Sequence, residues 1–124
     1  MKIWKRNDLL SNIEKAKIEY FKNGYIVIQN ILDEKLINDL NNSLGIFGYR
    51  KKDLWKTNKF VKQVGANKFI YNLLKKFYND QPLPFQTINF TYGTEQSLHS
   101  DLMHFSPSED NLEAMCGVWY ALED

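Results

Sequence analysis

The chain has 124 residues, of which 44% are hydrophobic and 15% aromatic, so it can bury the core of one small domain and is not a disordered tail. Its 16 lysine and arginine residues nearly balance 15 aspartate and glutamate residues, and the net charge of +1 argues against nucleic acid or a membrane as the main partner. Residues 1–20 contain no continuous apolar run, and the single Cys116 cannot form an intrachain disulfide, so we expect a cytoplasmic protein without a secretory signal or membrane span.

Helical spacing of apolar residues dominates the first 45 positions. Residues 8–23 place apolar side chains at helical intervals, and Gly24 follows where a helix often ends. The β-branched run at residues 25–28 predicts a short strand. Asp33 is typical of the residue that begins a helix and Gly45 of one that ends it, so a second helix is predicted between them.

The period of the apolar residues changes in the second half of the chain. Residues 46–66 give no clear pattern, and residues 69–78 predict a third helix with one apolar face. From residue 85 onward the period becomes two, which predicts strands over 85–92, 97–103 and 113–122. Helices therefore come first and strands second, which is the order of an α+β fold.

An imidazole and a carboxylate stand two residues apart at His99 and Asp101. On a strand this spacing places both side chains on one face, about 6.6 Å apart at a rise of about 3.3 Å per residue. Two histidines and one carboxylate, with open positions left on the ion, form the iron(II) triad of non-haem oxygenases. The pattern also occurs by chance, so a surface histidine beside a solvated aspartate is the alternative.

Three separated segments carry a resemblance to one family. The string Thr-Ile-Asn-Phe-Thr-Tyr-Gly-Thr-Glu-Gln-Ser-Leu-His-Ser-Asp, residues 87–101, resembles the strand, turn and metal strand of the phytanoyl-CoA dioxygenase family. Residues 117–124, Gly-Val-Trp-Tyr-Ala-Leu-Glu-Asp, are similar to the family's next core strand, and residues 20–33 to its opening helix, Gly-Tyr turn and strand. The chain thus resembles the N-terminal portion of an iron(II)- and 2-oxoglutarate-dependent oxygenase.

The resemblance implies a fold and a site. The fold is a set of helices packed on an incomplete double-stranded β-helix, a jelly-roll or cupin-like core, and the site binds iron(II) with 2-oxoglutarate as cosubstrate. His99 and Asp101 match two of the three iron ligands. Trp119 matches a position that lines the 2-oxoglutarate pocket and is expected to face the barrel interior, while Gln96 and Asn89 match polar positions near it. A core aromatic is the alternative for Trp119, and a turn residue bonded to its own backbone is the alternative for Gln96.

The family's second iron-binding histidine and its cosubstrate-binding arginine lie far downstream of the His-x-Asp pair. The histidines of this chain are His99 and His104, and its arginines are Arg6 and Arg50. None has that downstream position, and strand alternation directs His104 away from the metal. We therefore expect residues 1–124 to be one domain, the N-terminal part of a longer one, with no turnover alone. Through its unpaired strand edges it is expected to self-associate, to bind its missing half or to be poorly stable.

The function that the resemblance implies is hydroxylation of a small organic metabolite or acyl thioester, with dioxygen as the oxidant. One alternative is a non-catalytic jelly-roll pseudoenzyme or binding module. Another is a cupin-like metal enzyme that does not use 2-oxoglutarate. Residues 51–59 include four lysines, Lys51, Lys52, Lys56 and Lys59. These side chains either face an anionic substrate or form an ordinary solvated surface.

Overall fold

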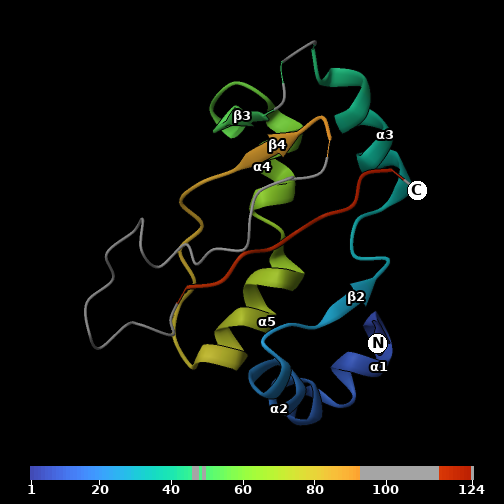
Figure 1. Ribbon diagram of the computed structural model, residues 1–124, viewed down its shortest axis with the longest axis vertical. Coiled ribbons are helices and arrows are strands. Elements are labelled where there is room, and N and C mark those ends of the chain that lie inside the picture. The colour runs from blue at the N-terminus through green and yellow to red at the C-terminus, as the bar shows by residue number, and fades with distance from the viewer. Residues whose placement is uncertain (46–47, 49, 93–114, 124) are drawn as a thin grey trace.

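The structure, a computed structural model, describes residues 1–45, 48, 50–92 and 115–123 (Figure 1). Its elements are β1 (Ile3–Lys5), α1 (Arg6–Leu10), α2 (Ile13–Asn23), β2 (Val27–Gln29), α3 (Glu34–Ser43), β3 (Arg50–Lys52), the 3-10 helix η1 (Leu54–Lys56), α4 (Lys59–Gly65), α5 (Lys68–Tyr78) and β4 (Ile88–Phe90). Helices and two small sheets make up this fold, which confirms the α+β class. The described residues form no closed barrel, so the jelly-roll core stays a prediction.

The first core lies between α1, α2 and α5. Its buried members are Trp4, Leu9, Ala16, Leu73 and Phe77. The adjoining sheet pairs β1 with β2 in parallel, with Trp4 opposite Ile28, and thereby anchors the start of the chain against this core. β1 was missed by the sequence analysis because three residues are too few to show a period.

The predicted helix over residues 8–23 is two helices. α1 ends at Leu10 and α2 begins at Ile13, and the Asn12 amide donates a hydrogen bond to the Asp8 carbonyl oxygen at 2.9 Å. Short polar side chains bond to nearby backbone and favour such breaks. The predicted end of α2 is confirmed, since Gly24 adopts a left-handed φ of 81° and its N–H donates to the Tyr20 carbonyl at 2.7 Å.

The second core lies between α3 and α4 and buries Leu40, Val61 and Val64. Asp33 begins α3 as predicted, because its carboxylate accepts a hydrogen bond from the Leu36 N–H at 2.7 Å. The helix ends at Ser43, two residues before the predicted Gly45.

The second sheet is an antiparallel ribbon of β3 and β4. Its register pairs Arg50 with Phe90, Lys51 with Asn89, and Lys52 with Ile88. The predicted strand over 85–92 is thus shortened to the three residues that find hydrogen-bonding partners in β3.

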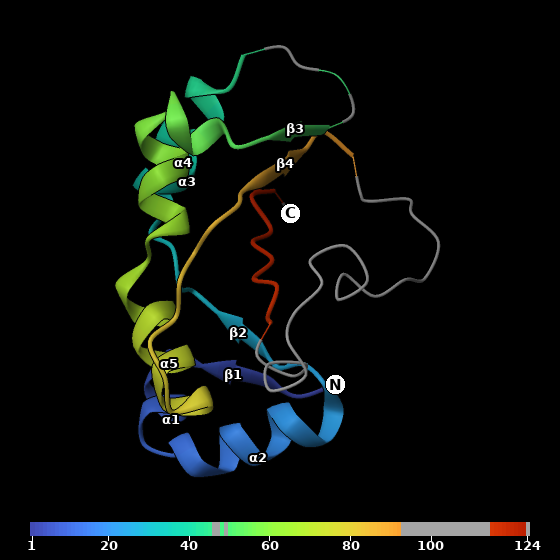
Figure 2. The ribbon, with the colours of Figure 1, turned by 90° about the vertical axis from the view of Figure 1, so that its left-hand side faces the viewer.

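Residues 115–123, here called the crossing segment, run across the molecule between the two cores (Figures 1 and 2). The predicted strand over 113–122 is wrong for the part that the structure describes, because residues 115–122 have no strand assignment. Alternation of apolar residues gives a strand only where a neighbouring strand supplies hydrogen bonds.

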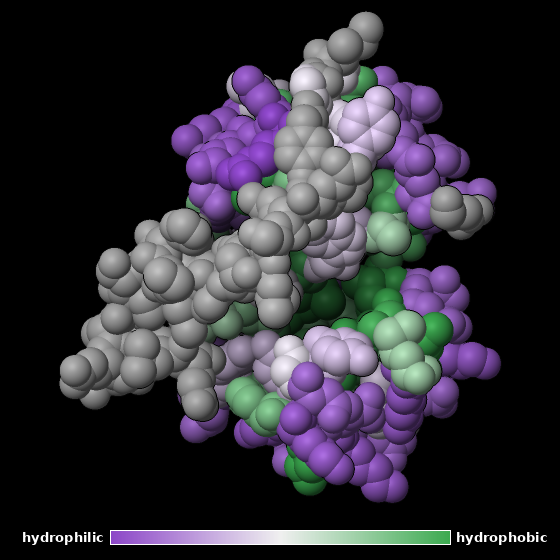
Figure 3. Space-filling view, viewed as in Figure 1, coloured by the Kyte–Doolittle hydropathy of each residue, from purple (hydrophilic) through white to green (hydrophobic). Residues whose placement is uncertain are grey.

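On the face of the molecule shown in Figure 3, apolar side chains gather in the middle, between two polar ends. Within the described residues, no helix is long and apolar enough to cross a membrane.

Candidate functional site

The predicted site residues divide into two groups. His99, Asp101 and Gln96 lie outside the described residues. Asn89 lies on β4, and Trp119 lies on the crossing segment. The structure therefore places Asn89 and Trp119, which lie before and after the His-x-Asp pair in the sequence.

Trp119 stacks on Phe90 of β4. The ring centroids are 5.5 Å apart and the ring planes differ by 20°, which is a stacked arrangement. Trp119 is nevertheless 64% exposed and belongs to neither core, so the expected interior position is wrong. The expectation relied on the resemblance and on strand alternation, and strand alternation does not apply to an irregular segment.

Asn89 and Trp119 are not brought together. Successive side chains of a strand point to opposite faces, so Asn89 points away from the face that carries Phe90 and Trp119. The two residues thus lie on opposite faces of the β3–β4 ribbon. Their roles near a cosubstrate stay predictions, and the ribbon geometry favours Trp119 over Asn89 as the partner of any ligand that contacts Phe90.

Asp53 joins the ribbon to η1, and the sequence analysis did not identify it. Its backbone is left-handed with φ of 55°, a conformation that aspartate tolerates better than most residues. Its Oδ1 accepts hydrogen bonds at 3.2 Å from the Trp55 indole N–H and the Thr87 backbone N–H. Its own N–H donates to the Thr87 carbonyl at 2.7 Å. Asp53 therefore fixes the start of β4, and its only sequence signal is an aspartate just before the Leu-Trp pair.

The other end of the crossing segment meets two tyrosines of the first core. The Tyr20 and Tyr78 hydroxyls are 2.6 Å apart, in one hydrogen bond. Burial, followed by hydrogen bonds with the Cys116 thiol and the Tyr78 hydroxyl, raises the pKa of Tyr20. Cys116 is thus a contact of α2, and it ties the crossing segment to the first core.

The crossing segment also reaches the second core. The Asn41 side-chain amide of α3 donates to the Leu122 carbonyl at 2.9 Å, and Tyr120 and Leu122 pack against the second core. Burial raises the pKa of Tyr120 to about 12. The segment is therefore held at both ends and at the Trp119 stack in its middle.

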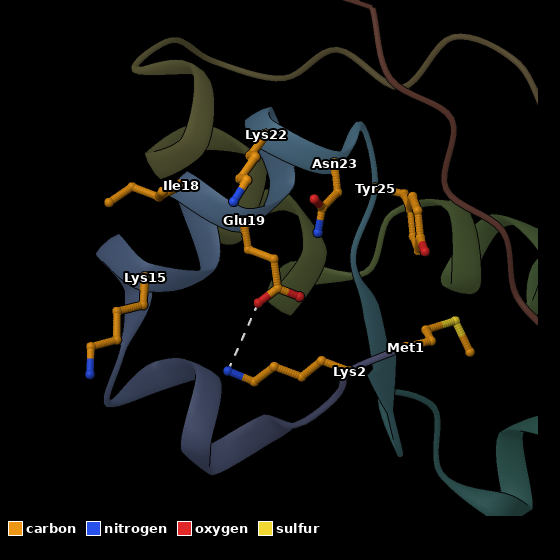
Figure 4. A pocket seen from close by; sticks show the side chains of 8 residues that line it. All are labelled: Met1, Lys2, Lys15, Ile18, Glu19, Lys22, Asn23 and Tyr25. Atoms are coloured by element: carbon orange, nitrogen blue, oxygen red, sulfur yellow. Dashed lines mark ion pairs between the residues drawn. The ribbon is translucent and has the colours of Figure 1, made fainter.

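A hollow of about 420 Å³ lies elsewhere, between the start of the chain and α2 (Figure 4). Its lining includes Lys2, Lys15, Ile18, Glu19, Lys22 and Tyr25. The Lys2 ammonium reaches to 3.8 Å from the Glu19 carboxylate across this hollow. None of the predicted site residues lines it, so we do not include it in the candidate site.

The metal site predicted from the sequence consists of His99 and Asp101. Imidazole and carboxylate are ligands that non-haem iron(II) accepts, so this donor pair suits the ion. Within residues 1–45, 48, 50–92 and 115–123, no group of three or more His, Cys, Asp and Glu side chains is placed to hold a metal. Comparisons with protein-family models, curated proteins and solved structures found no match.

Proposed function

We propose that this chain forms part of an iron(II)- and 2-oxoglutarate-dependent oxygenase of the phytanoyl-CoA dioxygenase type, which hydroxylates a small organic metabolite or acyl thioester. The observation that carries the proposal is the His99-Ser-Asp101 motif after a Gly-Thr turn, followed downstream by Gly-Val-Trp-Tyr-Ala-Leu. The order and spacing of these segments resemble the family pattern far more specifically than His-x-Asp alone.

The contact between β4 and the crossing segment supports this proposal. β4 precedes the motif and Trp119 follows it, and the Phe90–Trp119 stack brings these two flanks side by side. An aromatic surface at that place suits the apolar wall that a small-molecule site needs.

In the proposed site, the His99 imidazole and the Asp101 carboxylate hold iron(II) and leave several of its positions open. Bound iron(II), with 2-oxoglutarate and dioxygen, supplies the oxidising chemistry. The chain's own contribution is to fix the ligand pair and to shield one side of the site with aromatic rings. The family's third ligand and its arginine match no position in these 124 residues.

A non-catalytic binding module is the second candidate. The exposed Trp119, stacked beside a ribbon whose first strand is Arg50-Lys51-Lys52, is the observation that favours it, because such a surface binds ligands without a metal. Metal binding that depends on His99 separates the candidates, since a metal-free binding module shows none.

Anaerobic titration with cobalt(II), a spectroscopic substitute for iron(II), tests the ligand assignment. We expect His99→Ala and Asp101→Asn to weaken binding by about tenfold or more, because each removes one of two protein ligands. His104→Ala is the matched control and keeps the affinity of the wild type. Equal affinities of wild type and His99→Ala would exclude His99 as a ligand and with it the proposed site.

A further inference from the structure

The register of the β3–β4 ribbon sorts its side chains onto two faces. Residues directly opposite each other in an antiparallel pair project to the same side. Arg50 is opposite Phe90 and Lys52 is opposite Ile88, so these four side chains share one face. Lys51 and Asn89 share the other.

Trp119 extends the first of these faces. It stacks on Phe90, and with 64% of its surface exposed it still presents an indole surface to solvent. Ile88 on the same face is 37% exposed. The result is a flat, partly open aromatic surface held in place by the ribbon and by the two anchored ends of the crossing segment.

Among the residues that the structure describes, the basic side chains beside this surface have no ion-pair partner. Among the described residues, none of the salt bridges involves the three side chains of β3, which are all exposed. The neighbouring Asp53 carboxylate is already engaged by Trp55, Thr87 and the Lys56 ammonium, the last at 3.8 Å. A guanidinium and an ammonium therefore stand beside an exposed indole without a competing carboxylate from this ribbon.

We propose that the aromatic–basic face, defined by Arg50, Lys52, Phe90 and Trp119, binds a small molecule with a planar aromatic ring and an anionic group. The ring stacks on Trp119, and the anion pairs with Arg50 and Lys52. A guanidinium suits the planar fork of a carboxylate or a phosphate, and stacking on an aromatic side chain tolerates many ring types. The site requires no metal and no contribution from His99 or Asp101.

Two sources share this ligand chemistry, a nucleotide and an aromatic carboxylate. Calorimetric titrations with adenosine 5′-monophosphate and with 2-naphthoate distinguish them, without metal or 2-oxoglutarate. Two controls separate the contributions: adenosine has the ring without the charge, and inorganic phosphate has the charge without the ring. We expect at least one of the two aromatic anions to bind about tenfold more tightly than both controls, because stacking and ion pairing act together.

Variants on the two faces of the ribbon provide the matched comparison. We expect Lys52→Gln and Trp119→Ala each to weaken binding of the preferred anion by about fivefold or more, and Lys51→Gln, on the opposite face, to change it by less than about twofold. Circular dichroism confirms that the variants are folded, and Trp119→Phe, which keeps a ring, restores part of the affinity.

Three results would overturn the proposal. One is that neither aromatic anion binds more tightly than adenosine and phosphate. Another is that Lys51→Gln weakens binding as much as Lys52→Gln does, which would indicate non-specific charge attraction. The last is that the Trp119→Ala variant binds the preferred aromatic anion with the affinity of the wild type. Because metal is omitted, each of these results leaves the oxygenase proposal to be judged by the cobalt titration.

Discussion

The two cores of the molecule are closed in different ways. The first core contains Leu9 and Ala16, both 0% exposed, and is surrounded by helices and by the β1–β2 sheet. The second core has three buried residues and relies on Tyr120 and Leu122 of the crossing segment for part of its cover. The buried residues of the first core all lie within residues 4–77, whereas the second core also takes part of its cover from the crossing segment.

The largest expected effect comes from the first core. We expect Leu9→Ala to lower the free energy of unfolding by about 2–5 kcal/mol, because it removes a fully buried side chain and leaves a cavity. Leu10→Ala is the neighbouring control, since Leu10 is 50% exposed and its truncation changes stability by about 0.5 kcal/mol or less. Urea denaturation followed by circular dichroism measures both. Similar losses for the two variants would contradict the assigned burial.

A smaller loss is expected where the crossing segment covers the second core. Leu122→Ala removes a half-buried side chain, so we expect a loss of about 1–2 kcal/mol. Val118→Ala changes the same segment at a position that is 43% exposed and serves as the control. If the two variants are equally stable in urea, the second core closes without the crossing segment and the contrast between the cores is lost.

The N-terminal cap of α4 provides a further test of how stable the second core is. The Asn58 side-chain oxygen accepts hydrogen bonds from the Phe60 and Val61 N–H groups at 2.9 and 3.1 Å. Replacing Asn58 with alanine leaves these donors without that acceptor, so we expect a loss of about 1 kcal/mol. Asn42→Ala, at an exposed position within α3, is the control and should not lower the urea midpoint.

A pH dependence of stability is also expected in the second core. Burial raises the pKa of Tyr120 from 10.0 to about 12, so the folded protein favours the neutral phenol. The stabilisation is complete below pH 10 and is lost as the pH rises from 10 toward 12, because the unfolded chain ionises first. Tyr120→Phe should show a shallower decline of unfolding free energy in this interval. Parallel declines in both proteins would mean that Tyr120 is not shielded from water.

The sequence was a good guide wherever local contacts determine structure. The end of α2 at Gly24 and the start of α3 at Asp33 were predicted because each depends on hydrogen bonds within a few residues. β3 was not predicted, because its three basic residues form a strand only through pairing with β4 about 40 positions away. Residues 115–122 alternate like a strand but have no strand partner among the described residues.

The same distinction applies to the candidate site. Asn89 and Trp119 were both expected near one pocket, yet the ribbon register places them on opposite faces. Which face a residue occupies depends on pairing between distant strands, which a single sequence does not specify. His99, Asp101 and Gln96 lie outside the described residues, so their roles stay predictions.

The anchoring of the crossing segment also constrains the order of folding. The hydrogen bond between Asn41 and Leu122 joins residues 81 positions apart, and closing so long a loop has a large entropic cost before any contact compensates it. The first core joins α2 to α5 over 58 positions, and α3 and α4 are nearer still to each other in the chain. Refolding should therefore form the contacts within each group of helices before the crossing segment docks, so pulsed hydrogen exchange should find amides of α2 and α3 protected before Trp119 reaches its native fluorescence.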